Sequence, residues 1–259
     1  MRSARFRFAL LALTLVVTAC GSSTTNSTSD ATLTGTITVG AATSLTTSFT
    51  ALAAEFESRH PGVKVTLSFG SSKDVRTNIN NGAPIDVFAS SDWKNMKAVT
   101  EPLAAPAVEF ATNSLAIVVQ PGNPKHIASL ADLAGEGVSV ATGSPEVPIR
   151  VYTDTMLANN GLLEKVSANY NNFAANVAGV VTYVANGGSD AGVVYRTDVL
   201  AAGSSVLGVA IPDQQNVVAH YPIAELGSSK NHTLAEAFIT YVTSTDGQSI
   251  LKQFGFGAG

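Results

Sequence analysis

The chain has 259 residues, and its composition excludes several classes of protein. The formal net charge is −4, with 15 Lys and Arg residues against 19 Asp and Glu residues, so no basic surface for nucleic acid is expected. Cys20 is the single cysteine, which rules out a disulfide within the chain. The four histidines stand singly, without the spacing of a metal-binding motif. We therefore expect neither a metal site nor a cofactor.

The N-terminal part of the chain has the pattern of an export signal followed by a tether. Three arginines precede a short apolar run that ends in small residues and Cys20. This run is too short to remain as a membrane span, and the position of the cysteine resembles a bacterial lipobox. We predict a lipoprotein signal peptide over 1–20, lipidation of Cys20, and a flexible Ser- and Thr-rich tether over 21–34. The protein would then be exported and would sit at the outer face of the cytoplasmic membrane, held only by its lipid anchor, or in the periplasm.

Two successive units of strand, serine turn and helix follow the tether. Residues 36–40 alternate as a β-branched strand, and Ser44 is predicted to be the N-cap of the next helix. An apolar strand over 63–69 leads into Ser71 and Ser72, which open a second helix. In an open α/β sheet, ligands bind outside the carboxyl ends of the strands, where helix N-termini offer free amides to an anion. Ser44 and Ser72 are therefore candidates for one anion-binding pocket.

The rest of the chain alternates between apolar strands and helices with recognisable ends. Ser91 and Asp92 are predicted to cap a short helix, and Pro148 suits the first turn of another that ends near Gly161. A further helix begins at Asn176. This alternation predicts an α/β fold with a largely parallel sheet covered on both faces. The expected strands are 110–119, 138–141, 190–195, 206–211 and 223–226, and two helices are expected within 233–256.

Five short motifs occur in order along the chain: Ala42-Thr43-Ser44-Leu45, Phe69-Gly70-Ser71-Ser72, 82–90, Val147-Pro148 and 190–198. Together they resemble the periplasmic molybdate-binding proteins of ABC import systems, over nearly the whole chain from about residue 34 to residue 256. The resemblance implies a type II periplasmic-binding-protein fold with a mixed, mostly parallel sheet in each of two lobes. Residues 35–112 and 224–259 would form one lobe and 113–223 the other, with the ligand in the cleft between them.

The resemblance also implies a set of ligand-contacting residues. The serines of the family that contact the oxyanion fall on Ser44 and Ser72. Its backbone-amide donors fall on Ile149 and Val177, and its hydroxyl donor falls on Tyr195. None of the five is acidic, so the shell would consist of donors only and would favour an ion that is fully deprotonated at neutral pH over hydrogen phosphate.

Two departures from the family pattern concern positive charge. Ile149 and Arg150 stand where the family usually has a small residue and then glycine, and Lys73 stands where a small residue is common. The amide of Ile149 can still donate, because a backbone N–H does not depend on its side chain. The two cations either strengthen the attraction of the anion or alter selectivity, so Lys73, Arg150 and the neighbouring Ser71 are secondary site candidates.

The expected function is that of a monomeric receptor rather than an enzyme. It would capture molybdate, and tungstate as well, and deliver the ion to an ABC permease in the membrane. A binder of sulfate or another tetrahedral oxyanion is the main alternative. A serine-dependent enzyme is a weaker one, because neither Ser44 nor Ser72 lies in a Gly-x-Ser-x-Gly motif. The effector domain of a regulator shares this lobe fold, but it would need a DNA-binding helix pair in place of the export signal.

Overall fold

The computed structural model describes residues 33–259. The predicted signal peptide, the lipidation of Cys20 and most of the predicted tether lie outside the described residues. Within this range, ten strands form one hydrogen-bonded sheet. Eight of them follow the order β2-β1-β3-β9-β4-β7-β5-β6, and β8 and β10 (Gly257–Ala258) pair with β4 off this path. No helix among these residues is both long and apolar enough to cross a membrane.

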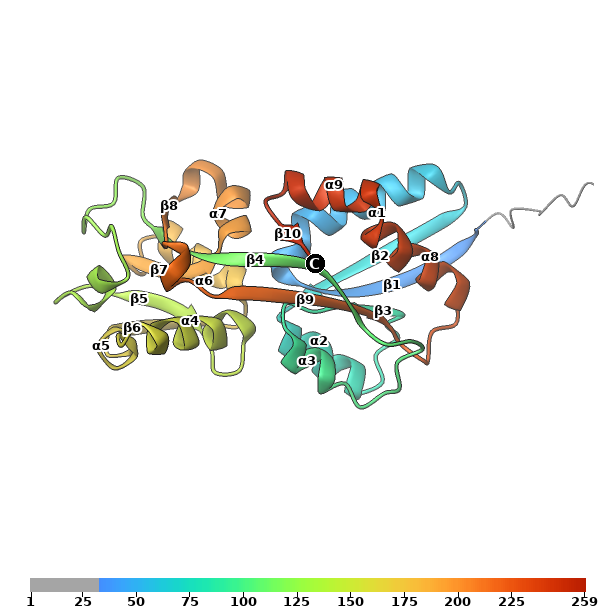
Figure 1. The fold of residues 1–259 in the computed structure, drawn as a ribbon, viewed down its shortest axis with the longest axis horizontal. Helices are drawn as coiled ribbons and strands as arrows, with labels where there is room; N and C mark the ends of the chain where they lie inside the picture. Colours follow the sequence, from blue (N-terminus) through green and yellow to red (C-terminus); the bar gives the residue numbers. More distant parts are fainter. Residues whose placement is uncertain (1–32) are drawn as a thin grey trace, which may run out of the picture. The chain divides into compact units, whose positions relative to one another are not determined.

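In the first lobe, three parallel strands are extended by an antiparallel fourth. The helices α1, α8 and α9 lie on one side of these strands, and α2 and α3 lie on the other (Figure 1). This arrangement buries both faces of the sheet, as the strand and helix alternation predicts. The elements are β1 (Gly35–Ala42), α1 (Thr46–Arg59), β2 (Val63–Gly70), α2 (Ser72–Asn80), β3 (Val87–Ala89), α3 (Trp93–Lys97), β9 (Val218–Glu225), α8 (His232–Thr243) and α9 (Thr245–Gln253).

The second lobe repeats this scheme with β5 between β6 and β7, all three parallel. Two short elements that the sequence analysis does not predict, α5 and β6, lie between α4 and α6, and a third, α7, follows β7 directly. The elements are β5 (Val140–Gly143), α4 (Pro148–Asn159), α5 (Leu163–Ser167), β6 (Tyr170–Ala174), α6 (Val177–Ala185), β7 (Ala191–Tyr195), α7 (Arg196–Ala202) and β8 (Leu207–Ala210).

The strand β4 (Val108–Val119) belongs to both lobes. Its first half pairs antiparallel with β9, up to Ser114 opposite Val218, and from Leu115 onward it pairs with β7 and β8. In Figure 1 it runs beside β9 from one lobe into the other. The end of β4 from Leu115 is almost entirely buried and apolar, as expected of a strand covered on both faces. The structure thus confirms the predicted two-lobed α/β class with mixed sheets.

The core of the first lobe forms where helix α1 meets the sheet. The apolar side chains Phe49, Leu52 and Phe56 of this helix are buried, and Phe49 lies edge-on to Phe110 and Phe238 at ring-centroid distances of 5.6 and 6.3 Å. Such edge-to-face pairs stabilise by about 0.5–1.5 kcal/mol each beyond the burial of their area. The start of α1 is therefore packed firmly at the carboxyl ends of the strands, where the candidate serines lie.

The predicted start of α1 is wrong, and the strand expected over 223–226 is longer than predicted, because β9 begins at Val218. Ser44 is not the N-cap of α1, because residues Thr43–Leu45 wind as a separate 3-10 turn and α1 begins at Thr46. Ala42 occupies the cap position of that turn, with no side-chain capping bond. The hydroxyl of Ser44 is bonded to a distant tyrosine, so it does not cap a local backbone amide.

Candidate functional site

Four N-terminal turns meet at one small cavity between the lobes. They are the 3-10 turn at Ser44 and the starts of α2, α4 and α6. The cavity is small, with an empty volume of about 210 Å³. Its lining consists of Ala42, Thr43, Ser44, Ser71, Ser72, Ser91, Val147, Pro148, Ile149, Asn176, Val177 and Tyr195.

Two serines at the start of α2 line the cavity, and one of them also caps the helix. Ser71 is the N-cap, since its Oγ accepts a bond from the amide of Asp74 at 3.1 Å. Ser72 is the first helical residue, and its Oγ lies 3.0 Å from the Oγ of Ser91 and accepts from the Ser91 amide at 2.9 Å. Ser91 thus lines the cavity and braces Ser72, while Asp92 alone caps α3.

Ser44 is held from the other end of the chain. Its Oγ lies 3.0 Å from the hydroxyl of Tyr221 on β9, and both side chains are buried. Burial raises the pKa of Tyr221 well above its usual value, so this phenol stays protonated. Sequence analysis missed Tyr221, because nothing near it in the chain marks a partner 177 positions away.

The second lobe brings backbone amides to the cavity. Ile149 is the second residue of α4, after Pro148 at the first position, and Val177 is the first residue of α6. Amides at these positions have no preceding helical turn to accept from them, so they are available to a ligand. Asn176 caps α6 through the amide of Gly179 at 3.1 Å, which leaves the Val177 amide to the cavity.

The placement of α6 depends on a glycine in the strand beneath it. A Cβ at Gly192 on β7 would lie 2.7 Å from Cγ1 of Val180 on α6. That distance is too short for a side chain, so only glycine lets the helix lie this close to the sheet. The N-terminus of α6 is thereby set level with the end of β7, where Tyr195 stands.

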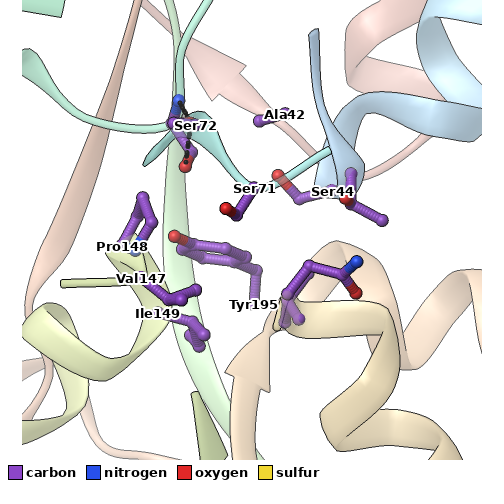
Figure 2. A pocket seen from close by; sticks show the side chains of 12 residues that line it. Ala42, Ser44, Ser71, Ser72, Val147, Pro148, Ile149 and Tyr195 are labelled. Atoms are coloured by element: carbon purple, nitrogen blue, oxygen red, sulfur yellow. Dashed lines mark hydrogen bonds between the residues drawn. The ribbon is translucent and has the colours of Figure 1, made fainter. Parts of the chain in front are cut away.

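Tyr195 ends β7 in the middle of the site. Its side chain lies between the serines of the first lobe and the segment Val147 to Ile149 of the second (Figure 2). It is 1% exposed, and its hydroxyl has no hydrogen-bond partner among the described residues. Burial raises its pKa well above the usual value, and the nearby Ser91 hydroxyl offsets only part of that rise. The phenol therefore stays protonated and offers a free donor to the cavity.

Thr43, like Tyr195, has a buried hydroxyl in the cavity, although it was not among the predicted site residues. It lines the cavity, and its Oγ1 is buried with no hydrogen-bond partner in the described part of the chain. Buried polar groups in folded proteins nearly always have partners, so such a group needs an explanation. Its place beside Ser44 in the Ala-Thr-Ser motif was the signal available in the sequence.

The two predicted cations lie outside the cavity lining. Lys73 Nζ is 3.8 Å from Glu146 Oε2, at the other side of the cleft. Arg150 Nε is 2.6 Å from Asp154 Oδ2, and its guanidinium carbon lies 4.7 Å from the ring centre of Tyr170. The third secondary candidate, Ser71, does line the cavity, but its hydroxyl is engaged with Asp74.

The described residues that line the site offer no acid or base for catalysis. No lining residue among those described is Asp, Glu or His. Over residues 33–259, no group of three or more His, Cys, Asp and Glu side chains is placed to hold a metal ion. The serine hydroxyls pair with Tyr221 and Ser91, and neither partner is a general base that could activate a nucleophile. The arrangement suits binding of an anion without chemical change.

Comparison with known proteins agrees with this geometry. The family model for bacterial extracellular solute-binding proteins matches residues 37–257. The molybdate-binding protein ModA of Mycobacterium tuberculosis is 37% identical over 255 residues, covering 96% of this chain and 94% of that protein. The solved periplasmic molybdate-binding protein of Azotobacter vinelandii has a TM-score of 0.75 at 24% identity, covering 86% of this chain and 99% of its own. The sulfate-binding protein SubI of Mycobacterium tuberculosis has a TM-score of 0.76 at 20% identity, with coverages of 85% and 86%.

At such identities, the two solved structures show a shared fold and nothing finer. The family match and the 37% identity over nearly the full length go further. They place the chain among solute-binding proteins of ABC transporters rather than enzymes. The chain belongs to the bacterial extracellular solute-binding proteins, in the group of the periplasmic molybdate-binding proteins.

Proposed function

We propose that this protein binds molybdate, and tungstate in the same way, in the cavity between its lobes. The observation that carries the proposal is the free, buried hydroxyl of Tyr195 in a cavity whose lining contains no carboxylate. A buried donor without a partner costs about 1–3 kcal/mol, and a bound oxyanion would remove that cost. The identity of 37% to a protein named as molybdate-binding supports the choice of ion.

The proposed shell consists of hydroxyls from one lobe and mainly amides from the other. Ser44 and Ser72 donate through their side chains, Ile149 and Val177 through their backbone, and Tyr195 through its phenol. The buried hydroxyl of Thr43 is a sixth donor in this proposal. We place Ser71, Lys73 and Arg150 outside the shell, because the Ser71 hydroxyl is engaged with Asp74 and both cations are paired with carboxylates.

The chemistry of the donors favours a fully deprotonated dianion. Each hydrogen bond to a charged ligand contributes about 1.5–3 kcal/mol, and each helix N-terminus adds about 0.3–1 kcal/mol. A protonated oxyanion needs an acceptor for its own proton, and the lining offers no carboxylate for that purpose. Molybdate, tungstate and sulfate therefore fit the shell better than hydrogen phosphate does.

Sulfate is the second candidate, because the sulfate-binding SubI shares this fold. The same number of donors would serve either ion, so cavity dimensions must decide between them. Sulfate is the smaller ion, and it would leave some bonds stretched in a shell sized for molybdate.

We further propose how the protein works in the cell. The lobes, divided as 35–112 with 224–259 and 113–223, would close on the ion by a hinge in β4 and β9. The closed form would dock as a monomer on an ABC permease. Export and a lipid anchor at Cys20 would hold it at the outer face of the cytoplasmic membrane, within reach of that permease.

Calorimetric titration of the protein with molybdate, tungstate, sulfate and phosphate, at one pH and one salt concentration, tests the proposal. We expect tight binding of molybdate and tungstate, weak binding of sulfate and none of phosphate. Preferential binding of sulfate would select the second candidate. If none of the four ions gives a heat of binding, oxyanion binding is refuted altogether.

A further inference from the structure

One ion pair joins the two lobes beside the cavity. Lys73 is the second residue of α2 and directly follows Ser72, and Glu146 directly precedes Val147. Both Ser72 and Val147 line the cavity, while Lys73 Nζ reaches to within 3.8 Å of Glu146 Oε2 across the cleft. The pair therefore links the two backbone segments that carry donors on opposite sides of the site.

The backbone at Glu146 is held in an uncommon conformation. Its φ angle is +68°, in the left-handed region that residues with a Cβ seldom adopt and glycine adopts freely. Such strain persists where surrounding structure holds it in place, and it is concentrated in clamps and switch regions. Here the strained residue is the one that reaches the opposite lobe.

The charges of the pair do not suit a role in attracting the anion. A carboxylate at the mouth of an anion site repels the ligand, and it neutralises the lysine that would attract it. A pair that forms between the lobes, by contrast, exists only in the closed form and favours that form. Resting on the proposed function, we propose that Lys73 and Glu146 form a latch that keeps the lobes closed and slows release of the bound oxyanion.

The expected change in the release rate follows from how far the two side chains are exposed to solvent. The side chains of Lys73 and Glu146 are 35% and 60% exposed, so the pair is screened by solvent and salt. Exposed pairs of this kind change an equilibrium by roughly two- to fivefold. We expect release of molybdate to accelerate by that factor when the pair is broken, and the difference to shrink at high salt.

The charge-removing variant Glu146→Gln separates a latch from simple electrostatics, because the two predict opposite signs. Loss of the latch speeds release of molybdate in stopped-flow chase experiments and weakens binding. Loss of a repulsive charge alone slows release and tightens binding. The matched control is Glu164→Gln, which removes the same charge from an exposed position on α5 in the same lobe and should leave the release rate unchanged.

A charge swap between the two residues is the second test of the latch. Lys73→Glu alone should speed release, and adding Glu146→Lys should restore the original rate if the contact matters. Slower release in Glu146→Gln, or no restoration in the swapped variant, would overturn the latch.

A ligand-free measurement keeps the latch and the proposed function separable. Fluorophores on Lys94→Cys of α3 and Lys165→Cys of α5, both exposed, report the distance between lobes in a chain that also carries Cys20→Ser. We expect Glu146→Gln to lower the energy transfer between them. A lowered transfer in a protein that binds no oxyanion would refute the proposed function and support the latch, whereas an unchanged transfer together with an unchanged release rate would overturn the latch.

Discussion

The two lobes contribute to the cavity in different chemical ways. The first lobe presents the side-chain hydroxyls of Ser44 and Ser72, each already paired with another hydroxyl. The second lobe presents the amides of Ile149 and Val177 and the unpaired phenol of Tyr195. Hydroxyl donors are lost when a side chain changes, but amide donors depend only on where a helix begins.

This difference has an energetic consequence. In the first lobe, a bound anion must share hydroxyls that already have partners, so part of each new bond replaces an old one. In the second lobe, the Tyr195 hydroxyl gains its first partner. The net gain from a hydrogen bond is largest where the group was buried and unsatisfied before. The side chain whose substitution weakens molybdate binding most should therefore lie in the second lobe.

The largest effect on binding is expected from Tyr195→Phe. Removal of one hydrogen bond to a charged ligand should weaken molybdate binding by about 10- to 100-fold. The thermal stability of the ligand-free protein should not fall, because the lost hydroxyl had no partner. Calorimetric titration and thermal unfolding measure the two quantities, and unchanged affinity would remove Tyr195 from the shell.

The comparison of side-chain and backbone donors is tested by Ser72→Ala against Ile149→Ala. Ser72→Ala should weaken molybdate binding by about tenfold and lower the free energy of unfolding by about 1–3 kcal/mol, because the buried Ser91 amide loses its acceptor. Ile149 is 1% exposed, and its truncation should lower the free energy of unfolding by about 2–5 kcal/mol while affinity changes by less than about threefold. Equal losses of affinity in the two variants would contradict the division between the lobes.

A smaller effect is expected at Thr43, which lies in the first of the five motifs but is not among the predicted ligand residues. Thr43→Val keeps the shape of the side chain, and it should weaken binding by about three- to tenfold. Thr142→Val is the matched control, because the Thr142 hydroxyl is also buried without a hydrogen-bond partner among the described residues but lies on β5 outside the cavity lining. If both variants bind molybdate as the original protein does, Thr43 is not a ligand.

The smallest expected effect is a dependence of stability on pH, through the Asp198 carboxyl that bonds the Tyr195 amide. Asp198 Oδ2 accepts a hydrogen bond from the Tyr195 amide at 3.0 Å, and burial raises the pKa of this carboxyl from 3.8 to about 7. The folded state therefore holds the proton more tightly than the unfolded state, so this group stabilises most at acid pH and less as pH rises from 4 through 7.

Thermal unfolding between pH 5 and pH 8 measures this contribution. Asp198 is only half-buried, so we expect the midpoint to fall by roughly 2–5 °C over that range. Asp198→Asn keeps an acceptor for the Tyr195 amide and removes the titration, and its midpoint should vary less with pH. A steeper fall in the variant would contradict the assignment.

Much of the site could be predicted because its parts have local signals. Pro148 at the first position of α4 and Asn176 as the cap of α6 mark where free amides begin. The same reasoning failed at Ser44, where a 3-10 turn replaced the expected cap, since its hydroxyl is bonded to Tyr221. Local rules apply only where no distant partner competes for the side chain.

The sequence by itself determined most of the strands and helices through apolar periodicity and caps, and the resemblance of its five motifs to a known family implied the two-lobed class and the candidate donors. Only the tertiary structure decided that Ser44 meets Tyr221, that Ser72 meets Ser91 and that Lys73 faces Glu146. It also decided the volume of the cavity and left the Tyr195 hydroxyl without a partner. These features depend on contacts between residues far apart in the chain, and they form only when the sheets pack and the lobes come together.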